Sequence, residues 1–293
     1  MTIRPFLALP LLLLIVEGSG TAGEVRHQPL ILREGGTAEQ PAVFDGHGLV
    51  VDLGIDVTGE AWQKDGDLWT HPGPLQGRQP IADVQRAGLF IDEVPLRIVR
   101  QRGGSAADAP ARFAPPDQLH PGQMGWAEDG SLYFRWPTGK TPGQARIILP
   151  PDQLQSAVVI ACSYLTVRNV TARYAANDGF NIHGDRQGIR LENVKAFSNG
   201  DEGISAHETV QMDVIGAEIA WNGSSAGGVA DVNESVTTYQ DCLLHHNLGA
   251  AFFFDGIHHR VTRCVVRNQA ADILIRMPEK TTVEVEDLTW EKP

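Results

Sequence analysis

The stretch Val194-Lys-Ala-Phe-Ser-Asn-Gly-Asp-Glu-Gly-Ile204 decides the fold, because similar stretches recur before and after it at intervals of 22 to 25 residues. One position of this repeat is occupied by Val170, Val194, Ala217, Cys242, Cys264 and Leu288. A fixed period of this size with short apolar positions is typical of a solenoid, in which each unit buries its apolar face against its neighbours. No stretch has a sustained helical period, so the sequence predicts an all-β solenoid.

Two flanking columns repeat with the same period. The first contains Val167, Leu191, Val214, Tyr239, Val261 and Val285, and the second contains Ala172, Ala196, Ile219, Leu244, Val266 and Trp290. A turn in each unit is marked by Asn199, Asn222, Asn247 and Asn268, the last arriving one residue early. Stacked asparagine amides can hydrogen-bond along a ladder, and asparagine tolerates left-handed backbone. Each unit therefore reads as two strands, an asparagine turn and a third strand.

The ends and the charge of the chain limit its location and partners. Residues 1–23 have a basic start, a short apolar run and a small-residue end, which predicts a secretion signal. We expect a secreted or periplasmic protein without a membrane span after signal cleavage. The formal net charge is −12, which argues against nucleic acid as a partner. The sequence does not indicate an oligomeric state.

Interruptions of the repeat predict four segments. After the signal, residues 24–58 form a first β-helix turn, residues 59–156 form a Trp-rich β insertion, and residues 157–293 form about six further turns. The insertion holds four of the six tryptophans, which either stack on sugar rings or form the core of a small β module; the core is the favoured interpretation. Cys242 and Cys264 fall on successive turns about 4.8 Å apart, which permits a disulfide, but a stack of small apolar side chains is the favoured interpretation.

The repeats resemble those of the right-handed parallel β-helix, or pectate-lyase-like, superfamily. Typical segments are Asn177-Asp-Gly-Phe-Asn-Ile182, the stretch 194–204 and the opening Gly36-Thr-Ala-Glu-Gln-Pro-Ala-Val-Phe-Asp-Gly46. The insertion, with Gly130-Ser-Leu-Tyr-Phe-Arg-Trp-Pro137, is similar to that of some β-helix glycoside hydrolases. The resemblance covers about residues 28–58 and 157–290. It implies a right-handed parallel β-helix, in a superfamily of lyases, hydrolases, epimerases, esterases and non-catalytic proteins.

Motifs of the polygalacturonases are only partly present. Asn177-Asp-Gly179 resembles their first acidic motif, and Asp201-Glu202 resembles the paired acid one turn later. Their Gly-His-Gly is replaced by Ala226-Gly-Gly228, and Ile275-Arg-Met277 stands nearest to their Arg-Ile-Lys. The sequence therefore does not predict polygalacturonase activity.

Alternation along the third strands predicts which side chains face outward. The predicted core columns are Phe180, Ile204, Ala230, Phe252 and Ile273, then Ile182, Ala206, Val232, Phe254 and Ile275. The outward columns are then Asn181, Ser205, Asp231, Phe253 and Leu274, followed by His183, His207, Asn233, Asp255 and Arg276. The register that places Val229 beside Ile204 is rejected, because it would turn Asp231 into the core.

These columns predict a groove for a polysaccharide along the third strands. Glycoside hydrolysis needs two carboxyl groups, and Asp231 and Asp255 are the predicted catalytic pair. The predicted sugar-binding residues are His183, His207, Asn233, Arg276 and Asn181, with Asp178 stacked on Glu202 at the strand entrance. We therefore predict a glycoside hydrolase without a resident cofactor or metal.

Three alternatives remain open. A polysaccharide lyase would use Arg276 or a histidine as its base and a cation, such as calcium, held by Asp178, Glu202 or Asp231. A non-catalytic carbohydrate-binding or surface protein would bind glycans without cleaving them. A transition metal on His183, His207 and Asp231 is the least favoured interpretation.

Overall fold

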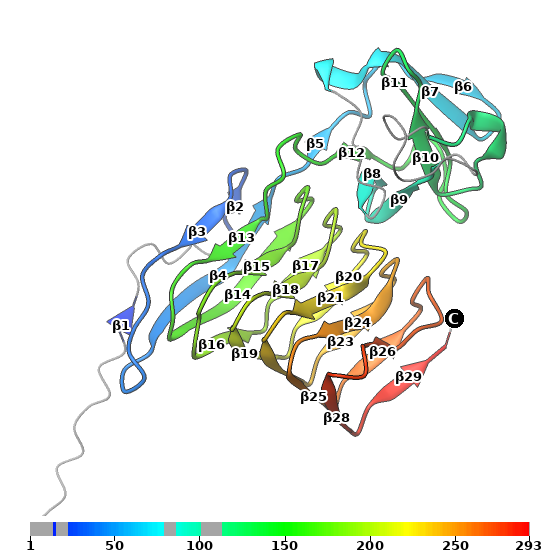
Figure 1. Ribbon diagram of the computed structural model, residues 1–293. Coiled ribbons are helices and arrows are strands. Elements are labelled where there is room, and N and C mark those ends of the chain that lie inside the picture. Colours follow the sequence, from blue (N-terminus) through cyan, green and yellow to red (C-terminus); the bar gives the residue numbers. More distant parts are fainter. Residues whose placement is uncertain (1–13, 16–22, 79–85, 101–112, 293) are drawn as a thin grey trace, which may run out of the picture.

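A stack of β-strand turns with a β module beside it makes up the protein (Figure 1). This computed structural model describes residues 14–15, 23–78, 86–100 and 113–292. The predicted secretion signal, residues 1–23, therefore lies almost entirely outside the described residues. Among the residues that are described, no helix is long and apolar enough to cross a membrane.

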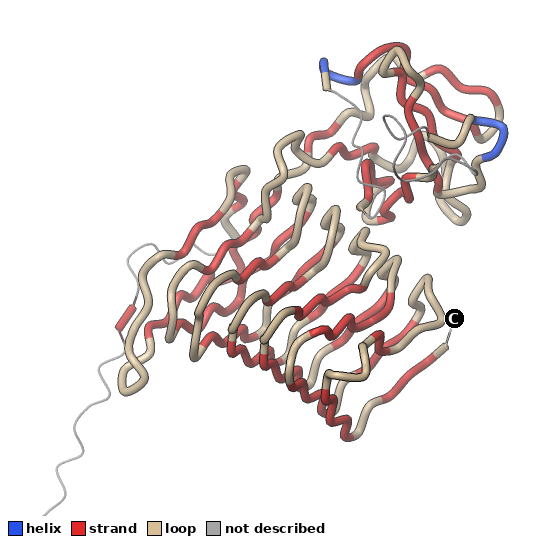
Figure 2. The backbone as a smooth tube through the Cα atoms, viewed as in Figure 1, coloured by secondary structure: helices blue, strands red, loops and turns tan. Residues whose placement is uncertain are grey.

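Two sheets form the walls of the solenoid, and the strands of successive turns lie side by side in both (Figure 2). The seven-stranded sheet contains β3 (Leu30–Leu32), β13 (Val158–Ile160), β15 (Phe180–Ile182), β18 (Ile204–Ala206), β21 (Gly227–Val232), β24 (Ala250–Asp255) and β27 (Ile275–Arg276). The large sheet contains β1 (Leu14–Ile15), β2 (Val25–Arg26), β4 (Ala42–Asp52), β14 (Leu165–Arg173), β16 (Ile189–Glu192), β17 (Lys195–Phe197), β19 (Gln211–Ile215), β20 (Glu218–Ala220), β22 (Val236–Gln240), β23 (Leu243–His245), β25 (His258–Thr262), β26 (Val265–Arg267), β28 (Thr282–Glu286) and β29 (Thr289–Glu291).

The predicted columns of the large sheet are confirmed. Val167 pairs with Leu191 and Ala172 with Ala196, and both columns continue in parallel register to Val285 and Trp290. The repeat position that first revealed the period is buried from Val170 to Cys264. All three cysteines are buried and unpaired, so the stack of small apolar side chains is the observed arrangement.

A column of left-handed residues bends the large sheet into two walls. In β14 the bend falls at Asn169, and in later turns it separates the two strands of each pair. The later members of the column are Asn193, Gly216, Asp241, Arg263 and Asp287, all with φ between 49° and 65°. This backbone conformation suits glycine, asparagine and aspartate, which explains most of the residue types at this position.

The predicted asparagine ladder is present, with one correction. The side-chain oxygen of Asn222 accepts hydrogen bonds from the backbone and side chain of Asn199, and Asn247 does the same for Asn222. At the next step Gln269, not Asn268, accepts from the Asn247 backbone, while Asn268 takes the left-handed position before the ladder. Asn268 arrives one residue early because it belongs to this neighbouring column.

The predicted register of the seven-stranded sheet is wrong at β21 and β27, whereas Phe252 and Phe254 of β24 lie in the predicted core columns. Ile204 pairs with Val229 and Ala206 with Asp231, which is the register rejected from the sequence. Val229 fills the core position, and Asp231 points inward with no exposed surface. The cost of burying this carboxyl is reduced by inward-facing polar side chains, described below.

The insertion forms an eight-stranded sheet of its own. Its strands are β5 (Ile55–Asp56), β6 (Gln63–Asp65), β7 (Leu68–Pro74), β8 (Ala87–Ile91), β9 (Val94–Ile98), β10 (Gln123–Trp126), β11 (Ser131–Arg135) and β12 (Ile147–Leu149), with short 3-10 turns η1 (Leu75–Gly77) and η2 (Pro116–Gln118). Trp69, Trp126 and Trp136 are buried in its core, so the favoured interpretation of the tryptophans is confirmed. The module packs on the solenoid where Phe90 meets the edge of Tyr174.

Candidate functional site

Three carboxyl groups meet where two turns enter the seven-stranded sheet. Asp178 lies two residues before β15, and Asp201 and Glu202 lie at the same level before β18. One oxygen from each lies within 4.8 Å of the others. We name Asp178, Asp201 and Glu202 the carboxylate cluster. The predicted stacking of Asp178 on Glu202 is present, and Asp201 joins the pair.

Asp178 is surrounded by hydrogen-bond donors. Its Oδ2 accepts hydrogen bonds from Ser205 Oγ at 2.7 Å, from Asn177 Nδ2 at 3.0 Å and from Asn181 Nδ2. Its Oδ1 accepts a longer one from the Glu202 backbone at 3.3 Å. These four donors fix the orientation of the Asp178 carboxyl group within the cluster.

The other two carboxyl groups hold their protons more tightly. Burial raises the pKa of Glu202 well above its ordinary value, and the charges of Asp201 and Asp178 add to the effect. Burial, followed by the charge of Asp178, raises the pKa of Asp201 to about 6. Ser224 Oγ lies 2.5 Å from Glu202 Oε1 and fixes that side chain. The cluster therefore places two carboxyl groups with raised pKa values beside Asp178.

The insertion reaches the carboxylate cluster through Arg86. The guanidinium Nε of Arg86 forms a 2.8 Å ion pair with Asp201 Oδ2, and the Ala87 backbone donates to the carbonyl of Gly200 at 2.8 Å. This cation opposes the rise in the pKa of Asp201. The β-helix supplies the acids, and the module supplies the cation beside them.

A pair of histidines follows the same two strands. His183 and His207 come directly after β15 and β18, and their rings stack with centroids 3.9 Å apart and planes 13° from parallel. The His183 side chain is 52% exposed, as predicted for the outward column. Asn181, one outward position earlier, is buried because its amide holds Asp178.

The predicted catalytic pair does not share one surface. Asp231 was predicted to face outward and instead lies in the core, where Thr237 Oγ1 donates to its Oδ2 at 2.7 Å. Asp255 faces outward and forms a 2.7 Å ion pair with Lys280. The prediction that Asp231 and Asp255 share one outward face is therefore wrong, and the one-residue shift in the register of β21 is the reason.

The observed register also places two predicted sugar-binding residues at positions that differ from the predicted ones. Arg276 pairs with Phe253, in the first outward column rather than beside Asp255. Val232 takes the position expected for Asn233, which instead adopts a left-handed turn with φ of 64°. The side-chain oxygen of Asn233 accepts the Glu208 backbone N–H at 3.0 Å. Sugar-binding roles for Arg276 and Asn233 stay predictions.

Three residues at or near these side chains were absent from the predicted set: Asp201 in the carboxylate cluster, Arg86 beside it, and Glu208, whose carboxylate lies 3.2 Å from His183 Nδ1. Asp201 was signalled by its place beside Glu202 in the acidic pair. Glu208 directly follows His207, so the proximity of two ligand-type side chains was visible in the sequence. Arg86 comes from the insertion, and no repeat relates it to the cluster.

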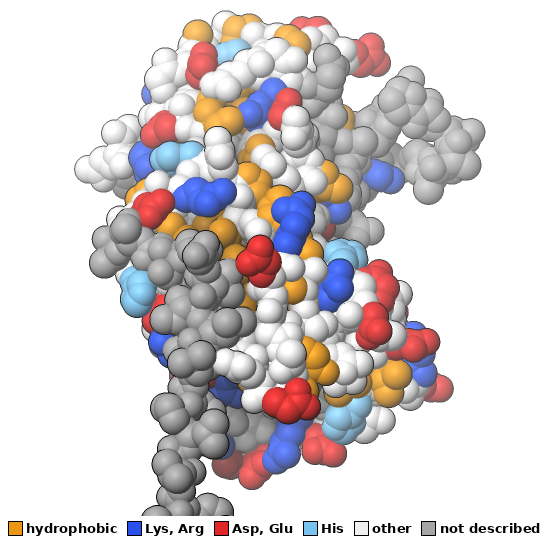
Figure 3. Space-filling model, turned by 90° about the vertical axis from the view of Figure 1, so that its left-hand side faces the viewer, with side chains coloured by type: hydrophobic (Ala, Val, Ile, Leu, Met, Phe, Trp, Pro, Cys, Tyr) orange, Lys and Arg blue, Asp and Glu red, His pale blue; other side chains and the backbone are white. Residues whose placement is uncertain are grey.

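The charge on the surface is mixed. Figure 3 shows acidic and basic side chains interspersed on the face at the N-terminal end of the solenoid.

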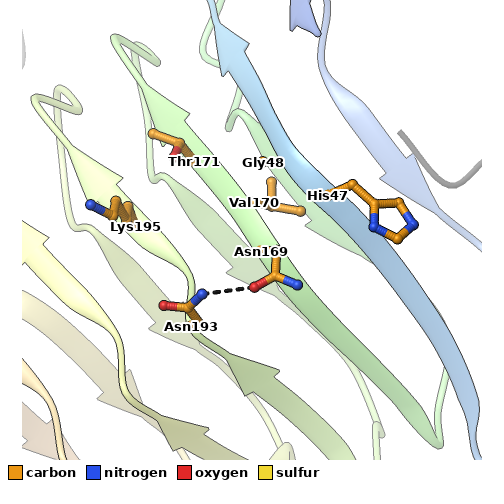
Figure 4. A pocket seen from close by; sticks show the side chains of 7 residues that line it. All are labelled: His47, Gly48, Asn169, Val170, Thr171, Asn193 and Lys195. Atoms are coloured by element: carbon orange, nitrogen blue, oxygen red, sulfur yellow. Dashed lines mark hydrogen bonds between the residues drawn. The ribbon is translucent and has the colours of Figure 1, made fainter. Parts of the chain in front are cut away.

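A pocket of about 330 Å³ opens at the bend of the large sheet. There Asn193 Nδ2 donates to Asn169 Oδ1 at 2.7 Å, between His47 and Lys195 (Figure 4). This amide contact joins successive turns, and Lys195 forms an ion pair with Glu218, so the polar groups there stabilise the stack.

Residues 156–288 match the family described as the right-handed β-helix region. The predicted right-handed parallel β-helix is confirmed. Two solved structures resemble this β-helix protein. One, titled "Glycoside hydrolase", has 11% sequence identity and a TM-score of 0.33, with 92% of this chain and 88% of that chain covered. The other, titled "The complex structure of XylC with xylose", has 10% identity and a TM-score of 0.35, and the match covers 92% of this chain and 62% of that chain. No curated protein is significantly similar in sequence.

Proposed function

We propose that the protein is an exported glycoside hydrolase that cleaves a polysaccharide at the carboxylate cluster. The observation that carries the proposal is the close approach of Asp178, Asp201 and Glu202 in environments that favour different protonation states. Paired carboxyl groups with separated pKa values are the requirement of glycoside hydrolysis. The catalytic assignment thus moves from Asp231 and Asp255 to this cluster.

Each carboxyl group has a defined role in this proposal. Glu202 gives its proton to the glycosidic oxygen as the bond from that oxygen to the anomeric carbon breaks. Water adds to the anomeric carbon and loses a proton to Asp201, whose pKa of about 6 suits a base near neutral pH. Burial, the charge of Asp201 and the charge of Asp178 together raise the pKa of Glu202, which favours its role as the acid.

Access to the acids is the structural condition for this chemistry. Asp178 is 2% exposed and Glu202 is 9% exposed, whereas the Asp201 side chain is 14% exposed. A sugar therefore reaches Glu202 when side chains that contact the cluster move aside, and Arg86 is one of them. The stacked, partly exposed His183 and His207 extend the same face beyond the cluster and offer hydrogen bonds to a polymer.

The test is a panel of neutral and uronate polysaccharides, with reducing ends and unsaturated products measured together. Hydrolysis predicts reducing ends without ultraviolet-absorbing products. Glu202→Gln and Asp201→Asn should each lower kcat by about 100-fold or more, since general acid and base catalysis each contribute about that much. The matched control is Asp213→Asn, an exposed carboxylate on the large sheet, which should keep full activity.

Further arms of the same experiment separate the alternatives. If Asp255→Asn abolishes activity while Glu202→Gln does not, the assignment to the carboxylate cluster is wrong. Unsaturated products that disappear with chelator would instead indicate a lyase with a cation on Asp178, Asp201 and Glu202, a set of oxygen ligands that suits calcium. Glycan binding without any product would indicate a non-catalytic carbohydrate-binding protein.

A further inference from the structure

A second group of ligand-type side chains lies just beyond the carboxylate cluster. It consists of His183, His207 and Glu208, and one donor atom from each lies within 4.8 Å of the others. Because β15 and β18 are parallel and Ile182 pairs with Ala206, the two histidines leave their strands at the same level. The parallel register therefore fixes the spacing of the two imidazoles.

Glu208 is directed toward the histidines by its backbone. Its φ of 50° is left-handed, and its N–H donates to Asn233 Oδ1 at 3.0 Å. Its Oε2 accepts the Gly184 backbone N–H at 2.7 Å and lies 3.2 Å from His183 Nδ1. A left-handed glutamate is uncommon, and here it turns the carboxylate back over the preceding turn. The carboxylate is therefore held in place before any ligand binds.

The surroundings leave room for an ion. The side chains of His183 and Glu208 are 52% and 49% exposed, so water can complete a coordination shell. Arg186 lies close by, and its Nε donates to the carbonyl of His183 at 3.2 Å, a contact made by the backbone rather than by the imidazole. Arg186 therefore occupies no ring nitrogen of His183, whose Nδ1 faces Glu208 Oε2.

We propose that His183, His207 and Glu208 bind a divalent first-row transition-metal ion, such as zinc, nickel or copper. Two imidazoles and one carboxylate suit these ions, whereas calcium and magnesium prefer oxygen ligands alone. Three protein ligands on an exposed edge leave coordination positions for water or a sugar hydroxyl. Glu208 replaces Asp231 as the third ligand considered from the sequence, because Asp231 lies in the core. This proposal stands independently of the glycoside hydrolase activity.

Binding of one ion by both histidines requires a change in the orientation of their stacked rings. With centroids 3.9 Å apart and planes 13° from parallel, the in-plane nitrogen lone pairs of the two rings do not converge, so one imidazole must rotate out of the stack before both face a common ion. Metal–nitrogen distances near 2.0–2.1 Å allow donor atoms about 3–4 Å apart around one ion. His183 is the ring with room to rotate, because its side chain is 52% exposed.

The test is calorimetric titration of the full, untagged and chelator-treated chain with zinc, nickel and copper chlorides. One ion per chain is expected. His207→Gln and Glu208→Gln should each weaken binding at least about tenfold, because each removes one of three ligands. Cobalt loading should give visible absorption bands from nitrogen and oxygen coordination, and the His207→Gln variant should lose or alter them.

The matched control is His258→Gln, which alters a different exposed histidine whose Nε2 lies 3.8 Å from Glu284 on the large sheet. The metal affinity of the His258→Gln variant should equal that of the unmodified chain. Circular dichroism of each variant shows whether the fold is kept. No saturable binding, or binding that survives both His207→Gln and Glu208→Gln, would overturn the proposal. Loss in His258→Gln with retention in His207→Gln would do the same and would assign the ion to the other face.

Discussion

Thr237 Oγ1 donates a 2.7 Å hydrogen bond to Asp231 Oδ2 inside the β-helix. Thr237 Oγ1 also lies 2.7 Å from His259 Nδ1. All three side chains are buried between the two sheets. Burial raises the pKa of Asp231 to about 7 and lowers the pKa of His259 to about 4. The core therefore holds two titratable groups in their neutral forms over the mildly acidic range.

Asp231→Asn should stabilise the protein above about pH 7. The pKa of Asp231 rises from 3.8 unfolded to about 7 folded, so its ionisation costs stability progressively between these values and fully above them. The amide removes a cost of up to about 4 kcal/mol, and its oxygen can still accept the hydrogen bond from Thr237 Oγ1. Urea unfolding at pH 5 and pH 8 measures the effect, and Asp255→Asn is the exposed control. Equal changes at both pH values would contradict it.

The same variant should reveal the titration of His259. Its pKa falls from 6.5 unfolded to about 4 folded, so its contribution to stability is present above 6.5 and lost as the pH falls toward 4. In the unmodified chain Asp231 produces the opposite trend over the same range. Asp231→Asn should therefore lose about 3 kcal/mol of unfolding free energy between pH 6.5 and pH 4 that the unmodified chain largely retains. A flat profile for Asp231→Asn between pH 6.5 and pH 4 would show that His259 does not titrate in this way.

Asp231 also shows where the sequence was sufficient and where it was not. The apolar columns predicted the register of the large sheet, because each member is apolar and the choice between faces is unambiguous. In β21 one register buries Val229 together with Asp231. The other register buries Ala230 and Val232 and exposes Asp231. The assumption that a carboxyl group stays out of the core gave the wrong register for β21. The polar side chains that accompany Asp231 in the core, Thr237 and His259, come from other strands and were not visible in the β21 sequence.

The candidate sites were predictable to different degrees. Asp178, Glu202, His183 and His207 were placed by the 24-residue period, since the register between β15 and β18 follows it. Arg86 lies outside every repeat, and its contact depends on how the insertion docks. The sequence therefore located the face of the site and missed the cation beside it.

Removing the middle of the asparagine ladder should destabilise the fold more than removing its end. In Asn222→Ala the backbone and side-chain N–H groups of Asn199 lose their acceptor, and the carbonyl of Ala196 loses a donor. Unsatisfied buried groups cost about 1–3 kcal/mol each, so a loss of about 3 kcal/mol or more is expected.

The end of the ladder supplies the matched control for Asn222→Ala. Gln269 accepts only from the Asn247 backbone at 3.2 Å in this ladder, and its amide nitrogen has no hydrogen-bond partner among the described residues. Gln269→Ala should cost about 1 kcal/mol. Chemical denaturation of both variants measures the difference, and equal losses would mean that the ladder does not act as a connected chain.

Arg86→Met should shift the pH dependence of catalysis if the carboxylate cluster is the active site. The ion pair with Arg86 favours the charged form of Asp201, whose pKa is about 6. Without the cation this pKa rises, by about one pH unit or more. Activity that depends on ionised Asp201 then begins at higher pH, so the acidic limb of the kcat/KM profile moves upward. The limb set by deprotonation of Glu202 should not move downward, because removing a cation also favours protonated Glu202.

Lys140→Met is the control, since Lys140 pairs with Asp92 and Glu93 elsewhere on the insertion. An acidic limb that stays in place in Arg86→Met would mean that Asp201 is not the base, whereas a loss of activity at every pH would assign Arg86 to substrate binding.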